Sequence, residues 1–160
     1  QNENLKETLN LLRNKAGKLA HVLFPMSILF LLLSKWMYPI IFNENFAESA
    51  NVFNVYLLII VSRLVFPQTI LIGLRKSKVI MTASLIEIVV NVFFSVLFIK
   101  TIGVIGVAYA TIVAYYLEKA LLMLYLRYRM NIRPAEYTPV RWFLFYSALI
   151  FIAYSIVSFL

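Results

Sequence analysis

The chain has 160 residues, 62% of them hydrophobic, and its mean hydropathy is +0.86. A soluble domain of this size cannot bury so much apolar surface, and four glycines and five prolines are too few for a disordered chain. Cysteine is absent, which excludes disulfides, thiolate metal sites and a cysteine nucleophile. The net charge of +8 allows binding to nucleic acid, so the placement of the charges decides what they mean.

Five apolar stretches predict membrane-spanning helices, because each is close to the ~20 residues that cross a bilayer. They cover residues 19–42, 52–74, 79–99, 104–126 and 142–160. Short connections make consecutive helices antiparallel neighbours. The predicted fold class is therefore all-α, a polytopic transmembrane helical bundle with five spanning helices.

The chain divides into four predicted segments. In residues 1–18, Leu5, Leu9, Leu12 and Ala16 recur at helical spacing, which predicts either an amphipathic helix on the cytoplasmic surface or a solvated connector. Residues 19–126 form a four-helix transmembrane portion. Residues 127–141 form a basic cytoplasmic linker, and residues 142–160 form an additional transmembrane helix.

Positive charge is concentrated in every second connection between the predicted helices. Eleven of the fifteen cations lie before the first span, between the second and third, and between the fourth and fifth: Lys6, Arg13, Lys15, Lys18, Arg75, Lys76, Lys78, Arg127, Arg129, Arg133 and Arg141. The loop over residues 43–51 instead carries Glu44 and Glu48. By the positive-inside rule, we expect a protein of the cell membrane with a cytoplasmic N-terminus and an external C-terminus. The cations then orient the chain in the lipid bilayer, and no nucleic-acid partner is expected.

Five ionisable residues lie inside the predicted spans: Lys35, Arg63, Glu87, Glu118 and Lys119. A charge in hydrocarbon costs about 2.5 to 3.5 kcal/mol even on lenient scales, so each is expected to face protein or water. Arg63 and Glu87 lie at similar distances on either side of the turn at Arg75 and Lys76, which places them at one depth near the midplane. Two interpretations of a meeting between them remain open, a neutralising ion pair and a role in substrate or proton coupling.

Polar residues also mark one face of the helix at 79–99, where Ser84, Glu87, Asn91 and Ser95 recur at intervals of three and four. This face is expected to point to the protein interior or to a water-filled cavity. Lys35 lines that cavity or extends to the outer interface, whereas Lys119 is expected to extend toward the cytoplasmic interface. The candidate substrate contacts are Lys35, Arg63, Glu87, Asn91 and Lys119.

Small residues and prolines are expected to shape the bundle. Gly103, Gly106, Ala110 and Ala114 form an edge that allows close helix approach. Pro25 and Pro39 are expected to interrupt the first helix, and Pro67 the second, by removing backbone hydrogen bonds and favouring kinks. No metal cluster, phosphate-binding loop or nucleophile with its base is recognisable, so neither an enzyme nor a cofactor is predicted.

Several motifs together resemble a known family. They are the run from Arg63 to Lys78 (RLVFPQTILIGLRKSK), the segment from Glu87 to Asn91, the sequence GVIGVAYAT from Gly103 to Thr111, Phe24-Pro25, and IFNENF from Ile41 to Phe46. In order and spacing they resemble the C-terminal lobe of polysaccharide-biosynthesis flippases, which belong to the multidrug, oligosaccharidyl-lipid and polysaccharide exporter superfamily. The resemblance covers residues 19–126, whose four helices resemble the third to sixth helices of that MATE-like lobe.

The resemblance implies a two-lobed bundle around a cationic cavity that alternates access and moves a polyprenyl-diphosphate-linked oligosaccharide outward. Lys35 and Arg63 then become candidates to contact diphosphate or anionic sugar. Five spans are fewer than the twelve or fourteen of the family, so a missing N-terminal lobe or a second chain is expected as partner. Two alternatives stay open: a cation-coupled multidrug exporter of the same superfamily, and a structural or assembly membrane protein without transport activity.

Overall fold

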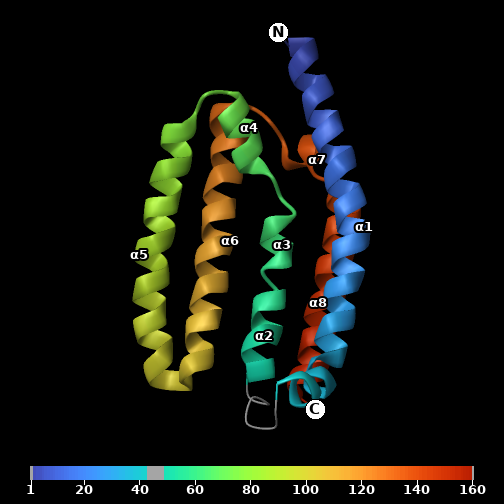
Figure 1. Ribbon diagram of the computed structural model, residues 1–160. Coiled ribbons are helices and arrows are strands. Elements are labelled where there is room, and N and C mark those ends of the chain that lie inside the picture. The colour runs from blue at the N-terminus through green and yellow to red at the C-terminus, as the bar shows by residue number, and fades with distance from the viewer. Residues whose placement is uncertain (1, 43–48, 160) are drawn as a thin grey trace.

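The computed structural model describes residues 2–42 and 49–159, and these fold into a helical bundle (Figure 1). The helices are α1 (Asn2–Ile41), α2 (Ser49–Leu57), α3 (Ile60–Arg63), α4 (Pro67–Gly73), α5 (Ser77–Ile102), α6 (Val104–Arg129), α7 (Pro134–Tyr137) and α8 (Val140–Phe159). By length and composition α1, α5, α6 and α8 can each cross a membrane, and the bent series α2 to α4 can form a fifth span. The prediction of a polytopic all-α bundle is confirmed. Glu44, Glu48 and the end of the IFNENF motif lie outside the described residues.

Helix α1 is longer than the predicted first span, because it passes from residue 18 into residue 19 without a break. Its amphipathic start packs Leu9 into a cluster with Ile70 and Leu71 of α4 and Tyr137 of α7. Pro25 and Pro39 both lie inside the helix and do not end it, and the expected kinks there stay a prediction. A proline removes only one backbone hydrogen bond, and in a long helix the neighbouring turns and packing can maintain the helix around it.

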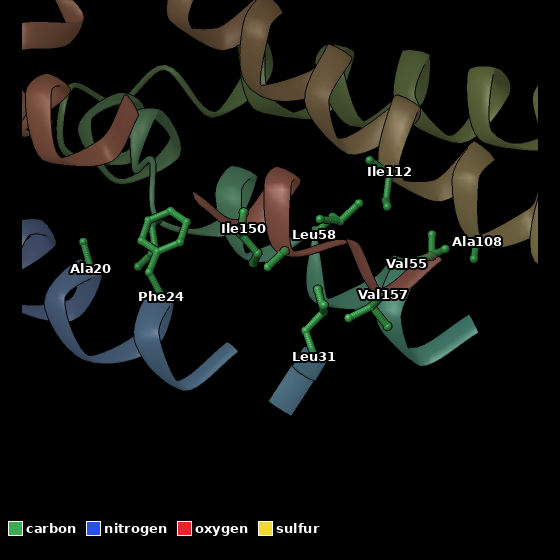
Figure 2. Packing of buried hydrophobic residues seen from close by; sticks show 11 residues of the cluster. Ala20, Phe24, Leu31, Val55, Leu58, Ala108, Ile112, Ile150 and Val157 are labelled. Atoms are coloured by element: carbon green, nitrogen blue, oxygen red, sulfur yellow. The ribbon is translucent and has the colours of Figure 1, made fainter. Parts of the chain in front are cut away.

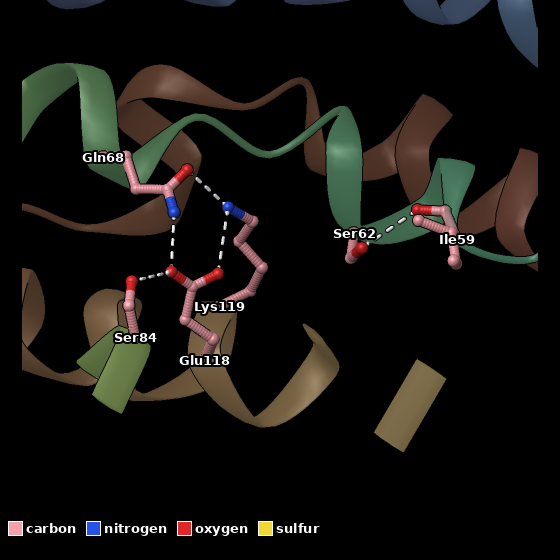
Figure 3. A network of polar contacts seen from close by, with 6 residues as sticks. All are labelled: Ile59, Ser62, Gln68, Ser84, Glu118 and Lys119. Carbon is pink, nitrogen blue, oxygen red and sulfur yellow. Dashed lines mark hydrogen bonds and ion pairs between the residues drawn. The ribbon is translucent and has the colours of Figure 1, made fainter. Parts of the chain in front are cut away.

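The second predicted span is broken into three helices, and the break before α4 follows from Pro67. Proline has no N–H to donate and fits the first turn of a helix, so α4 begins at Pro67 with Phe66 as its N-cap. The chain bends by 42° between the preceding helical segment and α4. The expected interruption at Pro67 is therefore confirmed, and it turns the next residue, Gln68, toward α5 and α6 (Figure 3).

Helices α5 and α6 form a close antiparallel hairpin (Figure 1). Gly103 joins them with φ of 71° and ψ of −154°, a backbone conformation that favours glycine. A Cβ on Gly106 would lie 2.6 Å from the backbone carbon and oxygen of Phe98, so glycine is needed for this approach. The prediction that small residues on α6 allow close helix contact is confirmed.

Apolar side chains are buried in the core of the bundle but mostly exposed on its peripheral helix α5. The larger apolar core lies among α1, α2, α6 and α8, where Phe24, Leu31, Val55, Ile112 and Ile150 pack together (Figure 2). Helix α5 instead lies at the periphery and buries little besides Ala83. Its exposed apolar side chains suit contact with lipid or with another helical body: Leu85, Ile88, Val89, Val92, Phe93 and Val96.

Candidate functional site

A buried polar network joins α4, α5 and α6 (Figure 3). At its centre are Glu118 and Lys119 of α6, whose residue exposures are only 3% and 5%. Glu118 Oε1 accepts hydrogen bonds from Gln68 Nε2 at 2.7 Å and from Ser84 Oγ at 3.2 Å. Lys119 Nζ donates to Gln68 Oε1 at 2.6 Å and lies 3.5 Å from Glu118 Oε2. The network therefore pairs every charge that it buries.

Gln68 suits the centre of this network because its side-chain amide has both a donor and an acceptor. The NH₂ group binds the carboxylate of Glu118, and the carbonyl oxygen binds the ammonium group of Lys119. Gln68 is the second residue of α4, directly after the break at Pro67. The bend in the second span thus places a bridging amide across an ion pair of α6, and the network links the bent segment to the α5–α6 hairpin.

Two further charged residues, Arg63 and Glu87, lie near the network and are less buried than Glu118 and Lys119. Arg63, the last residue of α3, is exposed, and its guanidinium carbon lies 4.4 Å from the centroid of the Tyr115 ring on α6. Glu87 of α5 is half-buried and lies close enough to Glu118, Arg63 and Lys119 to interact with them electrostatically. We call Arg63, Glu87, Glu118 and Lys119 the charge cluster. It contains two cations and two carboxylates from three helices, and Arg63 is its exposed member.

The structure corrects two of the sequence-based expectations. Arg63 and Glu87 do not form the neutralising ion pair that is one of the two interpretations of their meeting: within residues 2–42 and 49–159, the one ion pair within 4.0 Å is Lys119 with Glu118. Arg63 instead stacks on Tyr115, where an aromatic face stabilises a guanidinium group. Lys119 does not extend toward the interface, because Gln68 and Glu118 hold its ammonium group inside the bundle.

The other two candidates lie apart from the network. Asn91 is one turn beyond Glu87 on α5, and its Oδ1 accepts a hydrogen bond of 3.0 Å from Ser95. Lys35 is exposed on α1. In the described part of the chain, no hydrogen bond or ion pair joins either residue to the charge cluster. The structure thus brings Arg63, Glu87 and Lys119 together and leaves Lys35 and Asn91 outside.

Three residues of the site were not selected from the sequence: Gln68, Tyr115 and Glu118. Glu118 is one of the five ionisable residues within the predicted spans, but the pattern does not pair it with Lys119, whose side chain is long enough to reach the interface. A usable signal was present for Gln68, because Gln68 and Ser84 lie at similar distances on either side of the turn at Arg75 and Lys76. Counting from that turn places both at one depth, as it did for Arg63 and Glu87. Tyr115 carries no comparable signal among the ten tyrosines of the chain.

An exposed arginine beside neutralised buried charges can bind an anion. Its planar guanidinium group donates paired hydrogen bonds that match phosphate and carboxylate oxygens. The ring of Tyr115 restricts its position, and the polar network nearby joins α4, α5 and α6. The arrangement therefore suits anion recognition inside a membrane.

Comparison with known proteins agrees with a lipid transporter. The model of the family described as lipid II flippase MurJ matches residues 1–160, the whole chain. No curated protein and no solved structure matches the chain significantly. The expectation of a flippase for a lipid-linked precursor is confirmed at the level of the family, whereas membership of the polysaccharide exporter superfamily stays a prediction. With a family match over its full length and helices suited to several membrane crossings, the chain belongs to the lipid II flippase MurJ family.

Proposed function

We propose that this chain forms one wall of the path along which a polyprenyl diphosphate carrying a glycan crosses the membrane by alternating access. The observation that carries the proposal is that Arg63, in the middle of a bent span, is exposed while its guanidinium group stacks on Tyr115. An arginine facing hydrocarbon costs about 2.5 to 3.5 kcal/mol on insertion scales. This cost supports a position for Arg63 beside water or a polar partner, as a substrate path provides.

Arg63 is the proposed primary contact with the diphosphate. Two phosphate oxygens match the paired donors of its guanidinium group, and Tyr115 limits the positions that the side chain can take. Glu87 is placed to restrain Arg63 electrostatically and to release it when an anion arrives. Lys119 acts as a positioning residue, because its ammonium group is already bound by Gln68 and Glu118.

Lys35 and Asn91 are proposed contacts for other parts of the substrate. Both lie outside the network, Lys35 on α1 and Asn91 one turn from Glu87 on α5. A substrate with a diphosphate and a glycan is longer than one binding group, so contacts spread along the path are expected. Lys35 would meet the substrate at a stage of transport different from that at Arg63.

A second helical lobe is needed to complete the path, because alternating access requires two bodies that move relative to each other around the substrate. We propose that this lobe covers the exposed side of Arg63 and Glu87, whether it comes from the same or another polypeptide. The alternating positive charge of the connections supports an orientation with the N-terminal end of α1 in the cytoplasm and the C-terminal end of α8 outside.

The test is flipping of a lipid-linked diphosphate glycan by the intact flippase in proteoliposomes, with Arg63→Gln compared with wild type. A hydrogen bond to a charged group contributes about 1.5 to 3 kcal/mol, so transport at low substrate concentration should fall about tenfold or more. Arg129→Gln, at the exposed end of α6, is the matched control and should retain transport.

Folding and incorporation of both variants are measured by yield and by chromatographic profile. Unchanged transport by Arg63→Gln would contradict the proposal. Transport of hydrophobic cations instead of lipid-linked glycans would favour a multidrug exporter. Loss of assembly without a specific transport defect would favour a structural role.

A further inference from the structure

A basic groove lies on α1 where this helix meets Pro139, at the corner between α7 and α8. Its volume is about 880 Å³, and its lining includes Asn10, Arg13, Asn14, Lys15, Lys18 and His21. We call this surface the basic groove. Pro139, just before α8, closes one side of it and packs beside Gly17.

The chemistry of the groove suits a phosphate group. Arg13 offers paired donors, Lys15 and Lys18 offer ammonium groups, and Asn10 and Asn14 add neutral amides. No carboxylate is present among the described lining residues, and within residues 2–42 and 49–159 none of these three cations has an ion-pair partner. The groove therefore has positive charge that nothing in the described chain neutralises.

Aromatic contacts place this groove at the level of a membrane interface. His21 Nδ1 lies 2.8 Å from Tyr146 Oη, and the His21 ring meets Trp142 edge-on with 5.0 Å between centroids. Trp142 is itself half exposed. Tyrosine and tryptophan concentrate where the polar and apolar layers of a bilayer meet, and the apolar part of α1 begins next to this contact, at Leu19.

An apolar seam continues from the groove toward the membrane interior. On α1, Pro25, Leu29 and Leu32 follow His21 at intervals of four, four and three residues and are exposed. On α8, Phe145 and Leu149 follow Trp142 in the same direction and are also exposed. A molecule that fits both regions has an anionic headgroup and long apolar chains.

We propose that the basic groove binds the headgroup of an anionic glycerophospholipid of the phosphatidylglycerol class, with its acyl chains along the seam between α1 and α8. Such a lipid would neutralise Arg13, Lys15 and Lys18 and hold α1 against the start of α8. The basic groove shares no residue with the charge cluster, with Lys35 or with Asn91, so this proposal does not rest on the proposed substrate path.

The test measures lipids retained by the intact flippase in detergent, using native mass spectrometry during titration with phosphatidylglycerol or with phosphatidylcholine of the same chain length. The groove variant combines Arg13→Gln, Lys15→Gln and Lys18→Gln. The matched control combines Arg75→Gln, Lys76→Gln and Lys78→Gln, which removes the same residue types and the same charge from an exposed turn at the same end of the bundle.

Each basic residue near an anionic lipid surface contributes roughly 1 kcal/mol, so the groove variant should lose about tenfold or more in affinity for phosphatidylglycerol. The control should lose about twofold or less, and phosphatidylcholine should bind wild type weakly. Equal losses in the two triple variants would overturn the proposal, because they would show only general electrostatic attraction.

Two further results would also overturn it: equal retention of phosphatidylcholine and phosphatidylglycerol, and displacement of the lipid by glycerol phosphate at the same concentration, which would indicate a soluble phosphate ligand. If the triple variant does not fold, Arg13→Gln alone is compared with Arg75→Gln. The proposal then requires a loss of about threefold or more in the first variant only.

Discussion

The buried ion pair between Lys119 and Glu118 predicts a specific pattern of stability changes. In Lys119→Met, the carboxylate of Glu118 keeps its hydrogen bonds from Gln68 and Ser84 but loses the only cation within 4.0 Å of it in the described residues. Removing one partner of a buried pair costs about 3 to 5 kcal/mol, because a charge then stays buried without compensation. We therefore expect Lys119→Met to lower the free energy of unfolding by roughly that amount.

The double variant Lys119→Met with Glu118→Gln should recover most of this loss. The glutamine oxygen at position 118 can still accept from Gln68 and Ser84, while no unpaired charge is left in the network. Replacing both charges of a buried pair by uncharged groups of similar volume is often close to neutral. The free energy of unfolding of the double variant should therefore lie within about 2 kcal/mol of the wild-type value.

The assay is reversible unfolding of the purified protein in mixed micelles, with increasing mole fraction of a denaturing detergent, followed by far-ultraviolet circular dichroism and tryptophan fluorescence. Wild type, the two single variants and the double variant form a complete cycle. The reasoning is refuted if the double variant is destabilised by the sum of the single effects. It is also refuted if Lys119→Met costs less than about 1 kcal/mol.

Two further predictions concern packing and pH. Gly106→Ala should lower stability by about 1 to 3 kcal/mol, because the new Cβ would lie 2.6 Å from backbone atoms of Phe98, whereas Gly73→Ala meets nothing within 4 Å and should change melting much less. Burial raises the pKa of Tyr137 in the α7 linker to about 12 from 10.0. The contribution of its neutral hydroxyl to the free energy of unfolding is therefore fully present below pH 10. This contribution is lost as pH rises toward 12, to a total of about 2 to 3 kcal/mol. Tyr137→Phe should weaken the loss of stability between pH 9 and pH 11, and an unchanged pH profile would contradict this assignment.

The hydrophobic pattern predicted most of the fold because each span must satisfy its own backbone hydrogen bonds in a membrane. The close approach at Gly106 follows from residue size, whereas the hairpin at Gly103 depends on a positive φ that glycine adopts readily. The break at Pro67 was also predictable from the missing N–H. At Pro25 and Pro39 the same missing N–H does not end the helix, because a long packed helix can continue through a single proline.

The site was less predictable, because pairing between charges depends on rotation about each helix as well as on depth. Counting residues placed Arg63 and Glu87 at one level but did not show that Tyr115 lies under the guanidinium group. Lys119 has a side chain long enough to reach an interface, so only the position of Gln68 shows why it stays buried. The bend at Pro67 determines that position, and its direction cannot be read from hydropathy.

The most direct test of the central claim is the reactivity of a cysteine at position 63 with a charged, membrane-impermeant maleimide. The chain has no cysteine of its own, so Arg63→Cys and the control Val89→Cys each introduce one thiol into it, and any cysteines elsewhere in the intact flippase are replaced. Val89 is 67% exposed on the apolar outer face of α5. Because the reactive thiolate forms readily only in contact with water, we predict fast labelling at position 63, slow labelling at position 89, and protection of position 63 by a lipid-linked diphosphate glycan. Labelling at position 63 as slow as at position 89 would contradict a substrate path along Arg63.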